Sequence, residues 1–211
     1  MRKWLFIFLC IPYIVFAQTE SKEPKSSYSS GLLVGGGVGF ARNADDWYGL
    51  SDFFYTWSVY GKMEYKGNTA LGYRVRIEPE RSSHFFFDMD FWLNAKFYKD
   101  IDVFYEWEER TNPIVTVEAN DARLSFAFSP SVNYRISERW YVGLGLEPTV
   151  YFAKYRLLDL PIIWKVGYNF GKMDIAINYR LGLAHTLDKH TLFRGEVSDL
   201  NLSIYIPFVS R

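Results

Sequence analysis

The sequence predicts an all-β fold: a transmembrane, antiparallel, up-and-down β-barrel of about ten strands, with eight as the alternative number. Three observations lead to this class. Apolar and polar residues alternate with a period of two from Gly31 almost to the end of the chain. Several alternating segments are much longer than the five or six residues typical of soluble strands. Aromatic residues make up 19% of the chain beside 23% charged residues, and alternation places the two kinds on opposite faces of a strand.

The first residues of the 211-residue chain have the features of a secretory signal peptide. A basic start is followed by an apolar run from Trp4 to Phe16, then by Ala17. This run has about 13 residues and contains Pro12, whereas a membrane-spanning helix needs about 20. We therefore expect a cleaved signal peptide over residues 1–17, a flexible periplasmic lead-in over 18–30 and an outer-membrane β-barrel over 31–211.

Composition excludes several classes of function. Cys10, the single cysteine, lies inside the expected signal peptide, and Leu9 before it is not the small residue used in lipoprotein processing. The mature chain then has no thiol for disulfides, nucleophilic catalysis or metal ligation. The formal net charge is zero and there is no basic cluster, so the sequence does not indicate a nucleic-acid partner.

Strand by strand, the alternation is clearest from His84 to Tyr98, where phenylalanines fall on one face and residues such as Asp88 and Asp90 on the other. The same pattern recurs along the chain. The ten predicted strands are 31–41, 55–65, 69–78, 84–98, 101–108, 122–136, 140–152, 161–169, 173–184 and 199–208. The number falls to eight if 101–108 or 161–169 is not an independent strand.

The connections between these strands are of two kinds in alternation. Tight turns are predicted at 66–68, 99–100, 137–139 and 170–172, and mostly longer loops at 42–54, 79–83, 109–121, 153–160 and 185–197. Short turns on one rim and long loops on the other are typical of the periplasmic and extracellular ends of an outer-membrane barrel.

Balanced charges on the polar face, drawn from nearly every strand, favour a polar lumen in which they pair with one another. The residues expected in this lumen charge network are Lys62, Glu64, Arg74, Arg76, Asp88, Asp90, Lys96, Glu106, Arg123, Arg135, Glu147, Asp174 and Arg180. Several glycines, among them Gly39 and Gly72, fall on the same face, where a narrow interior needs small residues. Aromatic residues on the apolar face gather near strand ends, including Phe40, Tyr65 and Trp140, as in the aromatic girdles at the two lipid headgroup zones.

The segment from Leu200 to Phe208 alternates and ends in an aromatic residue, as does the terminal strand read by the outer-membrane assembly machinery. Pro207 and the three residues after Phe208 depart from that pattern. With the signal peptide and the long alternating strands, the chain resembles the small bacterial outer-membrane β-barrel proteins, the porin-like and OmpA-barrel-like superfamily. The resemblance covers residues 31–208 and implies fold and location without a function-specific motif.

Candidate chemistry is sparse in this sequence. The glycines at 35–37 and 39 lack the Gly-Lys-Ser/Thr ending of a phosphate loop. His84 and His185 fall at strand ends on the expected loop rim, with His190 in the last loop, where a rim-site hydrolase could place a general base beside an Asp such as Asp88 or Asp188; solvated loop residues are the competing interpretation. We assign no catalytic residue, no cofactor and no metal site.

Three functions therefore remain open. The first is a structural or surface-interaction barrel with a closed, ion-paired lumen and extracellular loops that bind an unidentified ligand. The second is a narrow small-solute channel, and the third is a rim-site outer-membrane hydrolase. About ten strands leave an interior little wider than its side chains, which favours the first. The expected partners are outer-membrane lipid and the outer-membrane assembly machinery.

Overall fold

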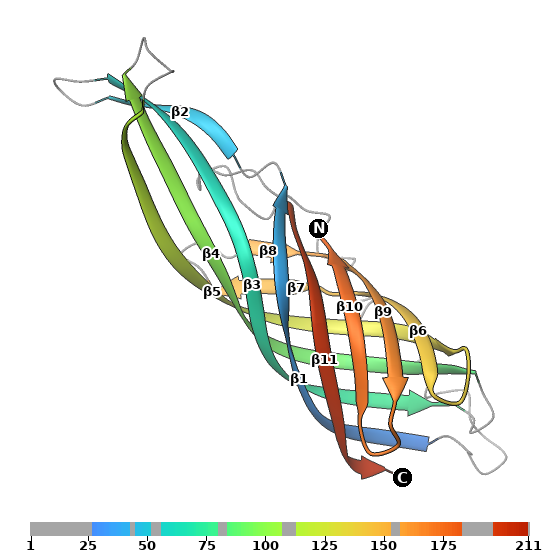
Figure 1. Cartoon of the computed structure of the whole chain (residues 1–211). Helices are drawn as coiled ribbons and strands as arrows, with labels where there is room; N and C mark the ends of the chain where they lie inside the picture. The colour runs from blue at the N-terminus through green and yellow to red at the C-terminus, as the bar shows by residue number, and fades with distance from the viewer. Residues whose placement is uncertain are drawn as a thin grey trace, which may run out of the picture.

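The computed structural model describes residues 27–42, 45–51, 56–79, 84–106, 113–152, 157–182 and 196–210, and within these ranges the chain forms one antiparallel sheet that closes into a barrel (Figure 1). The predicted signal peptide, residues 1–17, lies outside the described residues. Among the described residues, no helix is long and apolar enough to cross a membrane.

Eight strands close the ring, which is the lower of the two numbers that the sequence left open. Their order around the barrel is β1, β3, β4, β5, β6, β9, β10 and β11, with β11 paired back to β1. Of the short strands, β7 pairs with β5, β8 pairs with β7, and β2 pairs with β3. The strands are β1 (Ser27–Arg42), β2 (Asp45–Ser51), β3 (Thr56–Glu78), β4 (Phe85–Glu106), β5 (Pro113–Arg135), β6 (Trp140–Leu146), β7 (Thr149–Phe152), β8 (Leu157–Asp159), β9 (Ile162–Asn169), β10 (Asp174–Leu181) and β11 (Glu196–Ser210).

The strand register sets the tilt and the width of the barrel. Following paired residues around the ring from Ser29 on β1 brings the path back to β1 at Gly39, ten residues further along. Such an offset requires strands tilted by about 40° to the barrel axis. An eight-stranded barrel has an interior just wide enough for side chains to fill.

Two of the tight turns predicted from the sequence are strand interiors. β3 is one strand of 23 residues that runs through Lys66-Gly67-Asn68, and β4 is one strand of 22 residues that runs through Lys99-Asp100. Residues 66–68 have the composition of a turn, but the pairing of β3 with β4 continues on both sides of them. Ladder hydrogen bonds with a long neighbouring strand therefore override the local turn preference, and ten predicted strands become eight.

A β-bulge between Tyr65 and Gly67 changes which residues of β3 face inward. Because one extra residue moves every following side chain to the other face, the alternation inverts there. Tyr65 is only 4% exposed and lies inside, so its predicted place in the lipid-facing girdle is wrong. Lys62 and Glu64, predicted in the lumen, lie on the opposite face from Tyr65 and pair with each other there.

The turn rim of the barrel consists of the ends of β1 and β11 at Ser27 and Ser210 and the turns at 136–139 and 170–173. The two turns are those predicted at 137–139 and 170–172. Gly171 adopts a positive φ of 89°, and its N–H donates to Asn169 Oδ1 at 2.6 Å. β3 ends at Glu78 and β4 begins at Phe85, both at this rim. The loop predicted at 79–83 was expected at the other rim. The difference arises because β3 and β4 are each a fusion of two predicted strands.

At the other end, part of the sheet extends beyond the closed ring (Figure 1). We call this extension the overhang; it comprises residues 45–51 of β2, 56–66 of β3, 98–106 of β4 and 113–123 of β5. β1 pairs with β3 only up to Gly67, and β7 pairs with β5 only from Leu124. Above these residues β3, β4 and β5 continue as a sheet that β2 joins on the β3 side (Figure 1).

The outer surface of the ring is an apolar belt, and the interior is polar. On β4 the exposed belt residues run from Phe85 to Phe97, twelve residues apart, which corresponds to about 30 Å along the barrel axis at about 3.4 Å per residue and the tilt above. This is close to the thickness of a bilayer hydrocarbon core, about 30 Å. Exposed belt residues from the other strands include Val38, Leu71, Leu124, Phe126, Leu144, Trp164, Ile177 and Leu202.

Candidate functional site in the barrel lumen

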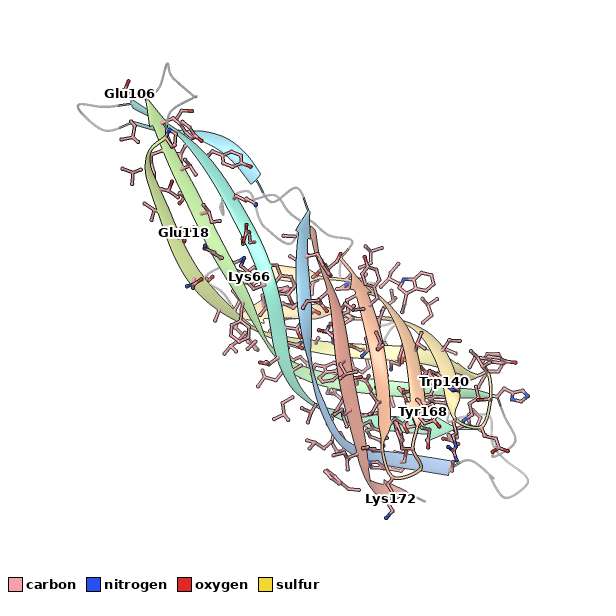
Figure 2. All side chains as sticks on the ribbon, viewed as in Figure 1. Lys66, Glu106, Glu118, Trp140, Tyr168 and Lys172 are labelled. Atoms are coloured by element: carbon pink, nitrogen blue, oxygen red, sulfur yellow. The ribbon has the colours of Figure 1, made fainter. Side chains whose placement is uncertain are left out.

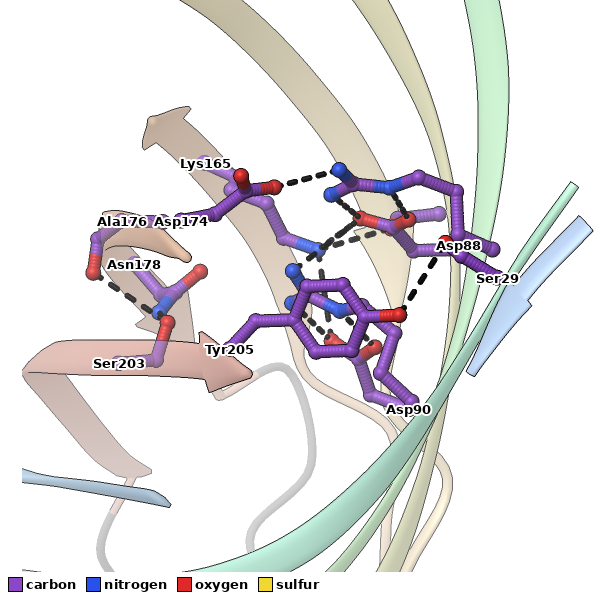
Figure 3. Close-up of polar contacts among 12 residues, drawn as sticks. Ser29, Asp88, Asp90, Lys165, Asp174, Ala176, Asn178, Ser203 and Tyr205 are labelled. Carbon is purple, nitrogen blue, oxygen red and sulfur yellow. Dashed lines mark hydrogen bonds and ion pairs between the residues drawn. The ribbon is translucent and has the colours of Figure 1, made fainter. Parts of the chain in front are cut away.

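Half of the lumen, on the side of the turn rim, holds a cluster of six buried charges (Figure 3). We call it the Arg74 cluster; its members are Arg74, Arg76, Asp88, Asp90, Lys165 and Asp174. Arg74 donates from Nε to Asp90 Oδ1 at 2.6 Å and from Nη2 to Oδ2 at 2.8 Å, a bidentate pair. Arg76 donates from Nε to Asp88 Oδ1 at 2.7 Å and also pairs with Asp174 across the lumen.

Lys165 connects the two arginine–aspartate pairs. Its Nζ lies 3.3 Å from Asp88 Oδ2 and 3.4 Å from Asp90 Oδ2. Three cations and three carboxylates thus balance within one buried group. Since a buried ion left without its partner costs several kcal/mol, this balance allows all six charges to remain out of water.

The half of the lumen towards the overhang holds a second balanced group, the Arg180 cluster: Lys96, Glu147, Arg180 and Asp199. Arg180 pairs with Glu147 at 3.0 Å and with Asp199 at 3.3 Å. Lys96 Nζ lies 3.3 Å from Asp199 Oδ2 and donates to the Tyr151 hydroxyl at 3.1 Å. Glu147 also accepts a hydrogen bond from Ser129 at 2.5 Å.

An apolar plate separates the two charge clusters. It consists of Leu33, Trp92, Ala127 and Tyr205, all buried and in contact. The Arg74 guanidinium lies 5.1 Å from the Tyr205 ring, and that of Arg180 lies 5.7 Å from the Trp92 ring, so each cluster contacts the plate. Gly72 makes room for the indole, because a Cβ there would lie 2.8 Å from the Trp92 ring.

Aromatic side chains close both ends of the lumen. At the overhang end, Tyr65 and Tyr98 stack with ring centroids 5.0 Å apart, in a cluster with Met63 and Val197. At the turn rim, Phe86, Tyr141 and Ala176 form the corresponding layer, and the Arg76 guanidinium lies 4.4 Å above the Phe86 ring. The lumen is therefore filled by alternating aromatic and charged layers around the apolar plate.

The residues predicted for the lumen charge network separate into two groups. The buried clusters contain Arg74, Arg76, Asp88, Asp90, Lys96, Glu147, Asp174 and Arg180. The other five lie outside these clusters: Lys62 and Glu64 on the outer face of the overhang, Glu106 exposed at the end of β4, Arg123 paired with Asp121 at 2.9 Å at the base of the overhang, and Arg135 paired with Glu78 at 2.5 Å near the turn rim.

Two members of the clusters were not among the predicted residues. Lys165 alternates with the lipid-facing residues Trp164 and Val166, so its position within the predicted strand 161–169 was a usable signal. Asp199 stands at the start of the predicted strand 199–208, next to the predicted loop 185–197. At such a boundary the alternation of residues does not decide whether a side chain belongs to the strand or to the loop. β11 in fact begins earlier, at Glu196, and continues through Pro207 to Ser210.

The lumen contains one pair that resembles a catalytic arrangement. Lys165 Nζ donates to Ser131 Oγ at 3.1 Å, and Ser–Lys pairs serve as nucleophile and base in some hydrolases. Here two carboxylates contact the same ammonium group, and both side chains are buried in the filled lumen. Because Ser131 and Lys165 are both buried among the packed side chains of the lumen, a substrate has no access to the Ser131 hydroxyl, and we assign this pair a structural role.

The histidine sites expected on the loop rim are not formed by the described residues. His84 lies at the turn rim, with its ring centroid 5.7 Å from that of Tyr134, and Asp88 is held by the two arginines. His185, His190 and Asp188 lie outside the described residues. In the part of the chain that the structure describes, no group of three or more His, Cys, Asp or Glu could hold a metal ion.

An apolar outer belt around an ion-paired interior is the reverse of a soluble barrel, and it defines this chain as a transmembrane β-barrel. No protein-family model and no curated protein sequence matches the chain. Among solved structures, it is similar to the translocator domain of the autotransporter NalP from Neisseria meningitidis, with 7% identity, a TM-score of 0.31 and coverage of 96% of this chain and 95% of that one. It is also similar to the β domain of the Bordetella autotransporter BrkA, with 11% identity, a TM-score of 0.32 and coverage of 85% and 98%.

Proposed function

We propose that this chain is an outer-membrane β-barrel protein with a closed lumen, which serves as a structural or surface-interaction protein through its overhang. The observation that supports this best is the filling of the lumen by the two balanced charge clusters and the apolar plate between them. Conducting pores of the porin type have 16 strands or more, about twice the number that closes this ring.

The two clusters and the plate also argue against the narrow-channel alternative. A permeating ion would have to displace Arg74 or Arg180 from their carboxylates and then cross the plate at Trp92, and apolar constrictions of this kind block ions by excluding water. The rim-site hydrolase alternative gains no support from the described residues.

The placement of the two rims supports an orientation for the proposed barrel. In bacterial barrels with an even number of strands, both chain ends lie at the periplasmic rim, with short turns there and longer extracellular connections. The turn rim would then face the periplasm and the overhang the cell exterior. Figure 2 shows Glu106, Glu118 and Lys66 on the overhang and Trp140, Tyr168 and Lys172 at the opposite end.

Export by a signal peptide over residues 1–17 and insertion by the outer-membrane assembly machinery complete this proposal. β11 alternates apolar and polar residues and closes the ring on β1. Outer-membrane lipid would contact the apolar belt.

The closed lumen is tested by planar-bilayer conductance of the refolded protein, with a heat-modifiable gel shift to show that the barrel has folded. We expect a folded protein that gives no steady conductance. Steady single-channel currents from a protein that shows the gel shift would overturn the closed-barrel proposal and assign the lumen to transport.

A further inference from the structure

Among the described residues, one edge of the overhang is a strand whose backbone is paired on one side only. Residues 113–121 of β5 pair with β4, and the described pairs on the other side of β5 begin at Leu124 with β7. Such an edge presents N–H and C=O groups in register for a further strand. The opposite edge of the overhang is formed by β2, which pairs with β3 from Asp45 to Ser51.

Apolar side chains are exposed along the same edge. Ile114, Val115 and Val117 are 46%, 51% and 48% exposed, on both faces of the strand. A long, exposed, partly apolar edge strand is a liability that proteins normally cover or protect with charge. Its position above the apolar belt means that lipid tails do not cover it. The edge therefore has the properties of a surface that is covered by a partner.

The charges around this edge select the sign of that partner. In the overhang parts of β4 and β5, five carboxylates stand against Lys99 and Arg123, a net charge of −3; the carboxylates are Asp100, Asp102, Glu106, Glu118 and Asp121. Asp100 lies opposite Ala119 in the strand register, so its carboxylate flanks the edge on the same face as Val117. A second copy of this chain would bring an equally acidic edge, which makes self-pairing unfavourable.

We propose that the β5 edge of the overhang, residues 113–121, is a docking site for an extended, cationic segment of a partner protein, which binds by adding a strand to the sheet. Backbone hydrogen bonds along the edge supply affinity. The Lys or Arg side chains of the segment lie on the face of Val115 and Val117, where they reach the Asp100 carboxylate, and its apolar side chains pack on Ile114 on the other face. This inference rests on the proposed function, since it names the partner class for the surface-interaction role of the overhang.

The test uses the full refolded barrel in zwitterionic detergent and a labelled synthetic peptide of about eight alternating Lys and Val residues, followed by fluorescence anisotropy. Two peptides of matched length serve as controls: one with Glu in place of Lys, and one with Pro at two of the Val positions, which keeps the charge but cannot pair along a strand. We expect binding of the Lys-Val peptide that is at least about tenfold tighter than that of either control.

Variants of the barrel locate the binding surface. Val117→Lys should weaken Lys-Val peptide binding by about tenfold or more, because it adds a like charge on the face where the Lys side chains of the peptide lie. Ile136→Lys, the matched control, adds the same charge at an exposed apolar position on the turn rim and should leave binding unchanged. Both variants must keep the heat-modifiable gel shift, so that loss of folding is not mistaken for loss of the edge.

Three results would overturn the inference: equal binding of the Lys-Val and Pro-containing peptides, equal weakening by both barrel variants, or sedimentation showing a dimer that Val117→Lys dissociates. The last would assign the edge to a second copy of the chain. None of these depends on conductance, so a silent barrel that fails to bind the peptide leaves the closed-lumen proposal in place, and a conducting barrel contradicts that proposal separately.

Discussion

Arg180 on β10 and Glu147, between β6 and β7, meet in the lumen with Arg180 Nε 3.0 Å from Glu147 Oε2. Both side chains are almost completely buried, at 4% and 1% exposure. Arg180 also holds Asp199, so it is the cation shared by the two carboxylates of the Arg180 cluster. The stability of this half of the lumen should therefore depend strongly on Arg180.

Arg180→Met should destabilise the barrel by about 3–5 kcal/mol, because it leaves two buried carboxylates with Lys96 as their remaining cation. The measurement is the free energy of unfolding by urea in lipid vesicles. Lys62→Met is the matched control. Its partner Glu64 lies on the outer face of the overhang, where an exposed pair contributes less than about 1 kcal/mol. Equal losses in the two variants would mean that Lys62 also belongs to the buried network.

The height of the apolar belt is tested by placing arginine at two outward positions. Leu71 is 57% exposed within the belt, whereas Ile114 is 46% exposed on the overhang. Leu71→Arg should cost about 2–4 kcal/mol near the bilayer midplane, and Ile114→Arg less than about 1 kcal/mol, since it is expected to lie in water. Unfolding titrations in vesicles give both values. If Ile114→Arg were the more costly change, the bilayer would extend over the overhang.

Asp100 gives the overhang a dependence on pH. Partial burial, together with the nearby carboxylates of Asp121 and Asp102, raises the pKa of the Asp100 carboxyl, although Arg123 opposes the shift. A carboxyl whose pKa is higher in the folded state binds its proton more tightly there, so stability is lost as pH rises from the ordinary carboxyl pKa of about 4 through the raised pKa.

Asp100→Asn should remove this contribution and make the overhang more resistant to proteolysis at neutral pH than the wild-type overhang. The difference between the two proteins should shrink as the pH falls below about 4, where Asp100 is protonated in both states. Limited proteolysis across this pH range measures the effect. A difference that grows on acidification would reverse the assigned direction of the pKa shift.

Period-two alternation was sufficient to predict most of the fold. It placed Asp88, Asp90, Arg74 and Arg180 on the polar face and Phe97, Trp140 and Trp164 on the apolar face. In the structure the four charged side chains are buried and the three aromatic side chains are exposed. It could do so because one residue's identity constrains its face wherever a strand separates lipid from a polar lumen. The turn predicted at 170–172 is also present, because Gly171 can adopt the positive φ that this turn needs without help from distant strands.

The parts that could not be predicted depend on contacts between strands distant in sequence. Whether Lys66-Gly67-Asn68 turns or continues is decided by β4, which pairs on both sides of it. The partners within the lumen are likewise set by the ring closure: Arg76 reaches Asp174 on β10, 98 residues away. The sequence contains the charges, but the register that brings them together is a property of the closed barrel.

The bulge on β3 provides the last prediction, because it brings Tyr65 over a glycine. A Cβ built on Gly39 would lie 2.1 Å from Tyr65 Cδ1, and the nearest atoms all belong to the Tyr65 ring. Gly39→Ala should therefore destabilise the barrel by about 1–3 kcal/mol, since the ring must leave its stack on Tyr98. In a Tyr65→Ala background the same change should cost little, because the obstructing ring is gone.

A double-mutant cycle of Gly39→Ala and Tyr65→Ala, read from unfolding free energies, isolates this contact. We expect a coupling energy of about 0.5–3 kcal/mol, with the double variant more stable than the sum of the single losses predicts. If Tyr65 pointed outward, as uninterrupted alternation back from Arg74 and Arg76 would place it, the two changes would act on opposite faces of the sheet and their effects would simply add. A coupling energy near zero would thus contradict the bulge, and with it the inversion of faces that places Lys62 and Glu64 outside the lumen.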